Sequence, residues 1–376
     1  MRLAFALYKY FPYGGLARDF VRIANICLEK GYLIDVYVME WQGDCIHGFN
    51  THILSCKGWS NHGKVADFHN QLHEKLSAKK YDVVIGFNKI PNIDVYYAAD
   101  SCYIDRFKEK SFFQTFNPRF RFYSSVERAV FGADSKTLCL MISDVQTGLF
   151  KQHYGIAEER LVCLPPGIDL SRRRPENAAE IRAKFRKARQ FNEQDIVILM
   201  VGTGFKTKGV DRAIEALSSL PDVLLSKTHL MVVGEGNLPP YERLAAERKV
   251  ADKVHLVGGR NDVPAFLLGC DVLLHPARKE NTGTVILEAM VAGLPVLVTG
   301  VCGYAKHVRK SQAGVVLNAP FLQEALNEQL AAMLASDKDN WAKNALDYAS
   351  QENLYSMPEK AVEAIECAAA SLKNVV

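Results

Sequence analysis

The chain has 376 residues, of which 48% are hydrophobic and 23% charged, and its net charge is +4. That length is too great for one ordinary core and predicts two domains, while the composition excludes a disordered or fibrous chain. The charge is too small to indicate nucleic-acid binding. Nine scattered cysteines without a CxxC pair indicate neither a zinc site nor a disulfide framework, and free thiols favour the cytoplasm.

The N-terminus, MRLAFALYKYFPYGG, is predicted to be a first β-strand, because its apolar stretch is short and no cleavage site of a signal peptide follows. No apolar run reaches the ~20 residues that a membrane-spanning helix needs. We therefore expect a soluble chain.

Short apolar runs alternate with longer amphipathic ones along the chain. The strands predicted in the first half are 3–8, 33–39, 51–56, 82–87, 95–100, 137–143 and 160–165. Those predicted in the second half are 196–202, 229–234, 254–257, 271–275, 295–299 and 314–317. Apolar, β-branched runs between helices are typical of parallel strands buried on both faces, so the sequence predicts an α/β protein with two successive doubly wound sheets.

Gly14 and Gly15 follow the first strand, and a helix is predicted to open at Leu16. Backbone N–H groups at such an opening approach phosphate or sugar oxygens closely, although a plain strand-to-helix turn is an alternative. Asp19 lies in the predicted first turn of this helix. Its carboxylate either takes part in a binding or catalytic site or only interacts favourably with the positive end of the helix dipole.

The second predicted sheet opens similarly with VGTGFKTKGVDRAIEAL, residues 201–217. Val210 and Asp211 stand where a P-loop needs Lys and Ser/Thr, and the third glycine comes too late for a dinucleotide motif. Lys206 and Lys208 then lie beside a helix N-terminus, which suits a diphosphate. The alternative is two exposed lysines in a turn.

Two carboxylates, Glu280 and Glu288, stand eight residues apart within 278–292. One unbroken helix would point them about 80° apart, so we expect Glu280 in a loop and Glu288 in the second turn of a helix capped by Thr282 or Thr284. Each carboxylate can accept hydrogen bonds from adjacent hydroxyls, one pair on a ribose and one on a hexose. The spacing offers little metal-site geometry. Lysines for phosphates and carboxylates for sugars predict a nucleotide-sugar site.

Three further predictions concern Asp100, His275 and the charged stretch 165–189. Asp100 ends a strand, where catalytic groups of α/β sheets are found, unless it only caps that strand. His275 directly follows a buried strand, so we expect it to pack beneath the site. The charged stretch 165–189 is interpreted as a domain boundary with a solvated linker and helix.

Residues 103–131 appear as an insert that breaks the alternation of strand and helix, with nine Phe/Tyr, six Lys/Arg and three acids. Cations among aromatic rings suit a membrane interface, a folded aromatic core is the alternative, and the low net charge disfavours nucleic-acid stacking. The residues expected to face a membrane are Phe112, Phe113, Phe116, Arg119 and Arg121.

The spacing of Glu280 and Glu288, followed by AGLPV at 292–296, resembles the E-x7-E motif of retaining glycosyltransferases of family 4. Segments such as YKYFPYGGLARDF, VIGFNKIPNIDVYYAAD and LYSMPEKA resemble the lipopolysaccharide core glucosyltransferase I group within it, over essentially 1–370. The resemblance implies a GT-B fold of two facing Rossmann-like domains with a cleft between them. Its expected parts are an acceptor domain 1–167, a nucleotide-sugar domain 168–355 and a helix 356–376 that packs back on the first domain.

The resemblance also assigns roles: Lys208 to phosphate, Glu288 to ribose, Glu280 to the transferred sugar and Arg260 to the base. Thr203 stands where many relatives have Arg or Ser, so the second cation is either Lys206 or Arg172. Asp100, Asp19 and Lys208 are expected at the reacting centre. The full donor set is Gly14, Gly15, Arg172, Thr203, Lys206, Lys208, Arg260, Glu280, Asn281, Thr282, Gly283, Thr284 and Glu288.

The expected activity is transfer of glucose from UDP-glucose to a heptose of the lipopolysaccharide inner core, with retention, no cofactor and no metal. We expect the enzyme at the cytoplasmic face of the inner membrane. One alternative is another nucleotide sugar with another lipid-linked glycan. A dehydrogenase is disfavoured because the dinucleotide motif is incomplete, and a non-catalytic binding protein because Glu280, Glu288 and Lys208 are all present.

Overall fold

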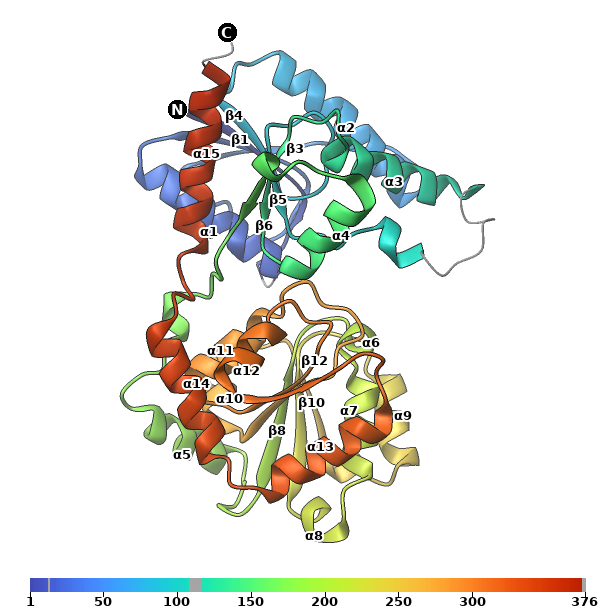
Figure 1. Cartoon of the computed structure of the whole chain (residues 1–376), viewed down its shortest axis with the longest axis vertical. Helices are drawn as coiled ribbons and strands as arrows, with labels where there is room; N and C mark the ends of the chain where they lie inside the picture. Colours follow the sequence, from blue (N-terminus) through green and yellow to red (C-terminus); the bar gives the residue numbers. More distant parts are fainter. Residues whose placement is uncertain (13, 108–115, 374–376) are drawn as a thin grey trace. The chain divides into compact units, whose positions relative to one another are not determined.

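The computed structural model describes residues 1–12, 14–107 and 116–373, which form two compact units (Figure 1). Unit 1 contains 1–167 and the segment from Tyr355 onward, and unit 2 contains Ile168–Leu354. Each unit is a parallel sheet covered by helices on both faces, which confirms the predicted doubly wound α/β class.

Seven parallel strands form the sheet of unit 1, in the order β3-β2-β1-β4-β5-β6-β7. The strands are β1 Arg2–Tyr10, β2 Leu33–Trp41, β3 Phe49–Ile53, β4 Val83–Gly86, β5 Val95–Ala98, β6 Leu138–Met141 and β7 Leu161–Cys163. The helices are α1 Gly15–Glu29, α2 Asn61–Ser77, α3 Pro118–Phe131, α4 Asp144–Tyr154 and α15 Met357–Lys373, with 3-10 turns η1 Ile104–Phe107 and η3 Glu158–Arg160.

Alternate side chains of β1 enter two different cores. Leu3, Phe5 and Leu7 pack with α1 and α15 on one face of the sheet, whereas Ala4 and Ala6 pack beneath large side chains of α2, α3 and α4 on the other. Small residues in the strand leave room for those larger side chains. The sheet is therefore buried on both sides, as its continuous apolar runs require.

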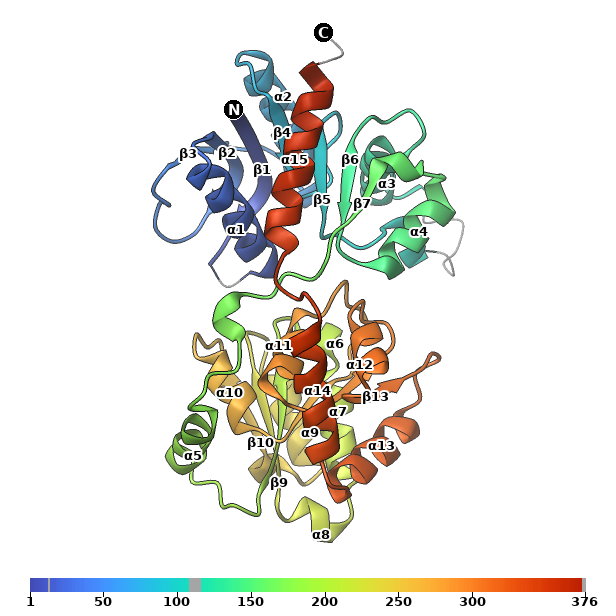
Figure 2. The same cartoon turned by 60° about the vertical axis from the view of Figure 1, so that its left-hand side comes forward.

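The C-terminal helix α15 completes unit 1 by packing beside α1 (Figure 2). The chain leaves and re-enters unit 1 through neighbouring segments, since the Met357 N–H donates to the Pro166 carbonyl at 3.2 Å. Within unit 2 the corresponding ends are also joined, because the Ile168 N–H donates to the Leu354 carbonyl at 2.9 Å. Unit 2 is thus one continuous stretch inserted into unit 1.

Six parallel strands form the sheet of unit 2, in the order β10-β9-β8-β11-β12-β13. The strands are β8 Ile196–Val201, β9 Thr228–Val233, β10 Val254–Gly258, β11 Val272–His275, β12 Val296–Thr299 and β13 Gly314–Leu317. The helices are α5 Ala178–Ala188, α6 Phe205–Lys208, α7 Val210–Ser218, α8 Asp222–Leu225, α9 Pro239–Glu247, α10 Val263–Gly269, α11 Thr284–Ala292, α12 Ala305–Ser311, α13 Gln323–Ala335 and α14 Asp339–Gln351, with 3-10 turns η4 Leu170–Arg172 and η5 Ala251–Lys253.

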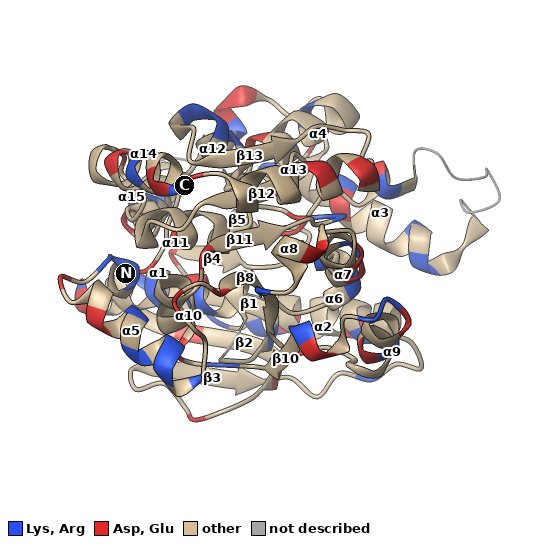
Figure 3. Cartoon of the chain, turned by 90° about the horizontal axis from the view of Figure 1, so that it is seen from below, with Lys and Arg blue, Asp and Glu red and all other residues tan. Residues whose placement is uncertain are grey.

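The charged stretch before β8 is only partly solvated. Figure 3 shows Lys and Arg along α5, but Arg182 and Arg186 both bind Asp271, at 2.5 and 3.2 Å. Arg186 is buried and also donates to the backbone carbonyls of Asn192 and Asp195. The interpretation of this run as solvated is therefore wrong for these two arginines, because a carboxylate before β11 pairs with them.

Candidate active site

The strand order of unit 2 changes direction between β8 and β11, and ligands of doubly wound sheets bind beyond the carboxyl ends of strands at such a point. The segments that follow β8 and β11 are held together there. The Arg278 N–H donates to the Thr207 carbonyl at 2.8 Å, and the Arg278 guanidinium binds both oxygens of Asp211 at 2.7 and 2.6 Å. This bidentate pair fixes the two segments side by side.

Lys206 and Lys208 lie on the four-residue helix α6, not in the open loop expected from the sequence. Gly209 ends α6 with φ +77°, and a Cβ at this position would lie 2.3 Å from the Pro276 carbonyl oxygen. Only glycine allows the chain to come this close to the segment after β11. As a result Lys208 faces that segment, whereas Lys206 is exposed.

Glu280 is in the loop after β11, as predicted, and receives three interactions. The Lys208 ammonium forms an ion pair with Oε2, and His275 Nε2 lies 3.0 Å from the same oxygen. The Asn281 N–H donates to Oε1 at 3.2 Å. Since an ionised carboxylate only accepts hydrogen bonds, the buried His275 ring is the donor.

The electrostatics of Glu280 favour a permanent negative charge. Burial by itself would raise the pKa of this carboxyl, but the hydrogen bond from His275 and the positive charge of Lys208 outweigh burial and lower the pKa to about 2. A carboxylate of such low basicity is a weak base and a weak nucleophile. It remains a good acceptor for ligand hydroxyl groups.

Glu288 lies in the second turn of α11, as predicted. It is 5% exposed, and its Oε1 lies 3.4 Å from Arg172 Nε, at the end of η4. The expected cap at Thr282 or Thr284 is wrong, because Gly283 is the N-cap with φ +81° and no side chain caps the helix. Glycine takes this left-handed conformation without strain.

The other residues assigned to the donor are spread more widely. Thr203 and Gly204 are exposed in the turn after β8, and the Thr282 carbonyl accepts from the Tyr304 N–H at 2.8 Å. Arg260 is exposed and forms a bidentate pair with Asp262 at 2.8 and 2.9 Å. Among the described residues, no three His, Cys, Asp or Glu side chains gather as a metal site.

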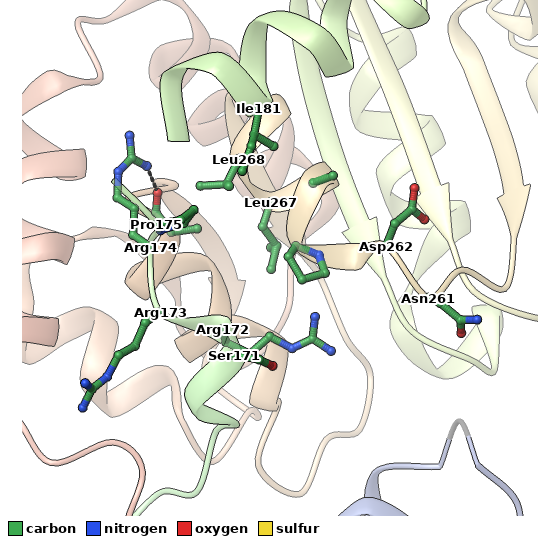
Figure 4. Close-up of a pocket in the computed structure, with 13 residues that line it drawn as sticks. Ser171, Arg172, Arg173, Arg174, Pro175, Ile181, Asn261, Asp262, Leu267 and Leu268 are labelled. Carbon is green, nitrogen blue, oxygen red and sulfur yellow. Dashed lines mark hydrogen bonds between the residues drawn. The ribbon is translucent and has the colours of Figure 1, made fainter. Parts of the chain in front are cut away.

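A cavity of about 390 Å³ lies next to Arg172, between η4 and α10. Figure 4 shows Arg172 extending toward the side that carries Asn261 and Asp262, while Arg173 extends away. Arg174 donates to the carbonyl of Ala292 at the end of α11. The sequence names Arg172 as a possible second cation but does not predict this cavity, because its other wall, α10, lies about 90 residues further along the chain.

Asp19 belongs to unit 1, and the structure corrects its position. The helix α1 begins at Gly15 with Gly14 as its N-cap, so Asp19 is the fifth residue and lies in the second turn, beyond the reach of a terminal cap. Its Oδ2 accepts a hydrogen bond from the Tyr97 hydroxyl at 2.8 Å. Burial raises the pKa of Asp19 to about 6, against the opposing effects of Tyr97 and Arg22.

Asp100 lies two residues beyond β5, at the carboxyl edge of the sheet of unit 1. Its Oδ2 is 3.3 Å from the Tyr96 hydroxyl and 3.5 Å from Asn88 Nδ2. Asn88 also accepts from the Tyr8 N–H at 2.8 Å, which ties the loop after β4 to β1. Asp19 and Asp100 therefore have separate sets of partners.

In the described parts of 103–131 the alternation of strand and helix continues, because α3 is the crossover helix between β5 and β6. Its second half is buried through Val126, Val130 and Phe131, so the alternative of a folded core holds for that half. Phe116 is 66% exposed, and Arg119 and Arg121 are exposed. Phe112 and Phe113 lie outside the described residues.

Comparison with known proteins places this arrangement among glycosyltransferases. The model of the family "Glycosyl transferases group 1" matches residues 181–348. The lipopolysaccharide glucosyltransferase WaaG of Escherichia coli K12 is 43% identical over 97% of this chain and 98% of its own length. A crystal structure of WaaG matches with a TM-score of 0.93 over 96% of this chain and 99% of that chain.

More distant relatives share part of the chain or only the fold. A GDP-mannose-dependent phosphatidylinositol monomannoside mannosyltransferase of Mycobacterium tuberculosis is 30% identical over 49% of both chains. The Anabaena protein Alr3699/HepE, solved with UDP-glucose, has a TM-score of 0.74 at 18% identity over the whole of both chains.

The two doubly wound sheets, together with the family match and the likeness to WaaG over nearly the whole chain, identify a hexosyltransferase of the GT-B class. Within that class, the chain belongs to the group 1 glycosyltransferases, in the family of the lipopolysaccharide glucosyltransferase WaaG.

The low pKa of Glu280 predicts a pH-dependent contribution to stability. Because the pKa in the folded protein is about 2 and the ordinary value is 4.5, the stabilisation is complete above about pH 4.5 and is lost as the pH falls toward about 2. We expect the melting temperature of Glu280→Gln to lie below that of the wild type by a constant amount from about pH 7 to 5.5. Calorimetry should show this gap shrinking below about pH 4.5; a constant gap would contradict the assignment.

Proposed function

We propose that this enzyme transfers glucose from UDP-glucose to a heptose of the lipopolysaccharide inner core and retains the α-configuration. The observation that carries the proposal is 43% identity with a lipopolysaccharide glucosyltransferase over nearly the whole of both chains. The site adds chemical support, since Lys208 and Glu280 meet at the change of strand order, where doubly wound sheets in general bind ligands.

The donor is proposed to lie along the carboxyl edge of unit 2. Glu280 accepts hydroxyls of the glucose, and Lys208 has further N–H donors for the diphosphate. Glu288 accepts the ribose hydroxyls. The cavity beside Arg172 has the size and the mixed polar and apolar lining of a pocket for the nucleoside.

The proposed reaction is a same-face substitution. The bond between the sugar C1 and the diphosphate oxygen breaks, the acceptor oxygen bonds to C1, and the acceptor proton moves to the departing diphosphate oxygen. Lys208 stabilises the charge that develops there. A double displacement would need a free carboxylate nucleophile, and Glu280 is unsuited because Lys208 and His275 hold its charge. On the acceptor side, unit 1 is proposed to present Asp100 to the reacting hydroxyl.

A donor and acceptor panel tests this function. UDP or GDP release is measured with UDP-glucose, UDP-galactose, UDP-N-acetylglucosamine and GDP-mannose, each with lipopolysaccharide truncated to the inner-core heptoses. We expect release with UDP-glucose and the heptose acceptor, an α-linked product by NMR, and unchanged rates in EDTA. A preference for another donor would favour the alternative reading, and loss of activity in EDTA with rescue by Mg²⁺ would overturn the metal-free mechanism.

Arg172, not Lys206, is proposed as the second phosphate-binding cation, because it lies beside Glu288 while Lys206 is exposed. A hydrogen bond to a charged group contributes about 1.5–3 kcal/mol, so Arg172→Met should weaken UDP binding about 10- to 100-fold. Lys206→Met, the matched control, should change it less than about twofold. Titration calorimetry with UDP measures both; the reverse order would contradict the assignment.

We also propose that the enzyme binds the cytoplasmic face of the inner membrane through the exposed first turn of α3 and the residue Phe116 just before it. Phe116 offers an exposed ring, and Arg119 and Arg121 offer cations to anionic headgroups. Within the described residues, no helix is long and apolar enough to span a bilayer.

Reversal of the two arginines, R119E with R121E, tests membrane binding. At about 1 kcal/mol for each cation lost, binding to phosphatidylglycerol vesicles should weaken at least roughly 30-fold in a sedimentation assay. The control reverses two exposed lysines of α5, K184E with K187E, and alters net charge equally. Equal losses in both variants would show a nonspecific effect of charge and sink the proposed surface.

A further inference from the structure

Behind Asp100 lies a buried ion pair that the proposed mechanism does not use. Lys89 follows β4 and is 8% exposed, and Glu127 lies on α3 and is fully buried. The Lys89 ammonium binds Glu127 Oε2 and lies 5.2 Å from the centre of the Phe150 ring. Burying two charges is costly unless further hydrogen bonds satisfy them, so the remaining partners of this pair are informative.

Those partners are backbone groups of the segment that follows Asp100. Lys89 Nζ donates to the Ser101 carbonyl at 2.8 Å. Glu127 accepts from the Tyr103 N–H at 2.6 Å and from the Ile104 N–H at 3.1 Å. The intervening Cys102 N–H donates to the Gln146 side chain at 2.7 Å. Side chains thus bind the backbone of four consecutive residues, from Ser101 to the first residue of η1, Ile104.

The pair is itself fixed to the sheet. The Tyr8 hydroxyl of β1 donates to the Lys89 carbonyl at 2.8 Å, and the Tyr154 hydroxyl of α4 donates to Glu127 at 2.8 Å. Burial would raise the pKa of Glu127. The positive charge of Lys89 and the hydrogen bonds from Lys89, the Tyr103 N–H and the Tyr154 hydroxyl outweigh burial and lower this pKa. Because each of these buried charges is satisfied by the backbone of 101–104, the pair restrains that segment.

We propose that Lys89 and Glu127 are positioning residues for the acceptor: through the backbone of 101–104 they hold Asp100 where the acceptor hydroxyl arrives. This inference rests on the proposed function in that Asp100 faces the acceptor. It assigns no chemistry to Lys89 or Glu127, which act only through that segment. Their loss should affect the acceptor and leave the donor site of unit 2 unaffected.

Glu127→Asp is the main test variant, because it keeps the charge beside Lys89 but retracts the carboxylate by one methylene. A second variant, K89M with E127Q, removes both charges together and so avoids leaving one buried charge unpaired. The matched control is Lys79→Met, which removes an ion-pair partner from the 1%-exposed Asp35 on β2 of the same unit. Asp35 retains Arg2, His52 and Asn50 as partners.

Three quantities are measured on the full chain: transfer to truncated lipopolysaccharide, the dissociation constant for UDP, and amide hydrogen exchange at 101–104. We expect both test variants to lose roughly 10- to 100-fold in kcat/KM for the acceptor, the scale of a misplaced reacting group. Exchange at 101–104 should accelerate, and UDP affinity should change less than about twofold. Lys79→Met should lower the melting temperature without changing transfer or exchange at 101–104.

Opposite results overturn the inference. Unchanged exchange at 101–104 would show that the pair does not hold the segment, and equal losses in UDP affinity and transfer would show a general structural role. Faster exchange at 101–104 with unchanged kcat/KM for the acceptor would show that this segment does not position Asp100 for the acceptor. Failure of the proposed function itself is distinct, because the wild type would then fail to glucosylate truncated lipopolysaccharide.

Discussion

The ion pair between Lys208 and Glu280 is the interaction on which the candidate site of unit 2 depends. It joins two segments that are 72 residues apart in the chain, and it forms only because Gly209 lets α6 approach Pro276. Lys208 and His275 keep Glu280 ionised, and Glu280 in turn holds the Lys208 ammonium in place. A ligand that binds here meets charges already paired and oriented, so little reorganisation is required.

The strands and the loop-and-helix placement of Glu280 and Glu288 are predictable from the sequence, because local residue patterns determine them. Every predicted strand overlaps an observed one, because buried parallel strands are continuous apolar runs. Glu280 and Glu288 were placed correctly because the intervening NTG favours a loop. Local detail was less predictable: the four-residue helix α6 is too short to leave a periodic signal, and Gly283 replaces the threonines as N-cap because its backbone is left-handed.

Features built from distant residues were not predictable. Asp271 lies 85 residues beyond Arg186, and Glu127 lies 38 beyond Lys89, so composition shows these residues as ordinary charges without their partners. The sequence does not predict α3 as a buried crossover helix, because the aromatic and basic residues of 103–131 obscure the apolar positions that bury it. The cavity beside Arg172 is also not predictable from local sequence, because its walls come from two segments far apart in the chain, η4 and α10.

The insertion of unit 2 into unit 1 has a consequence for biosynthesis. Domains generally fold as units while the chain emerges from the ribosome, and unit 2 is a single uninterrupted stretch that ends at Leu354. Unit 1 lacks the side chains of Met357, Ala361 and Ile365 until all of unit 2 has been translated, although they belong to the core beside α1. Unit 2 is therefore complete in the nascent chain before unit 1, and a ribosome that stops shortly after Leu354 leaves unit 1 with an exposed apolar face.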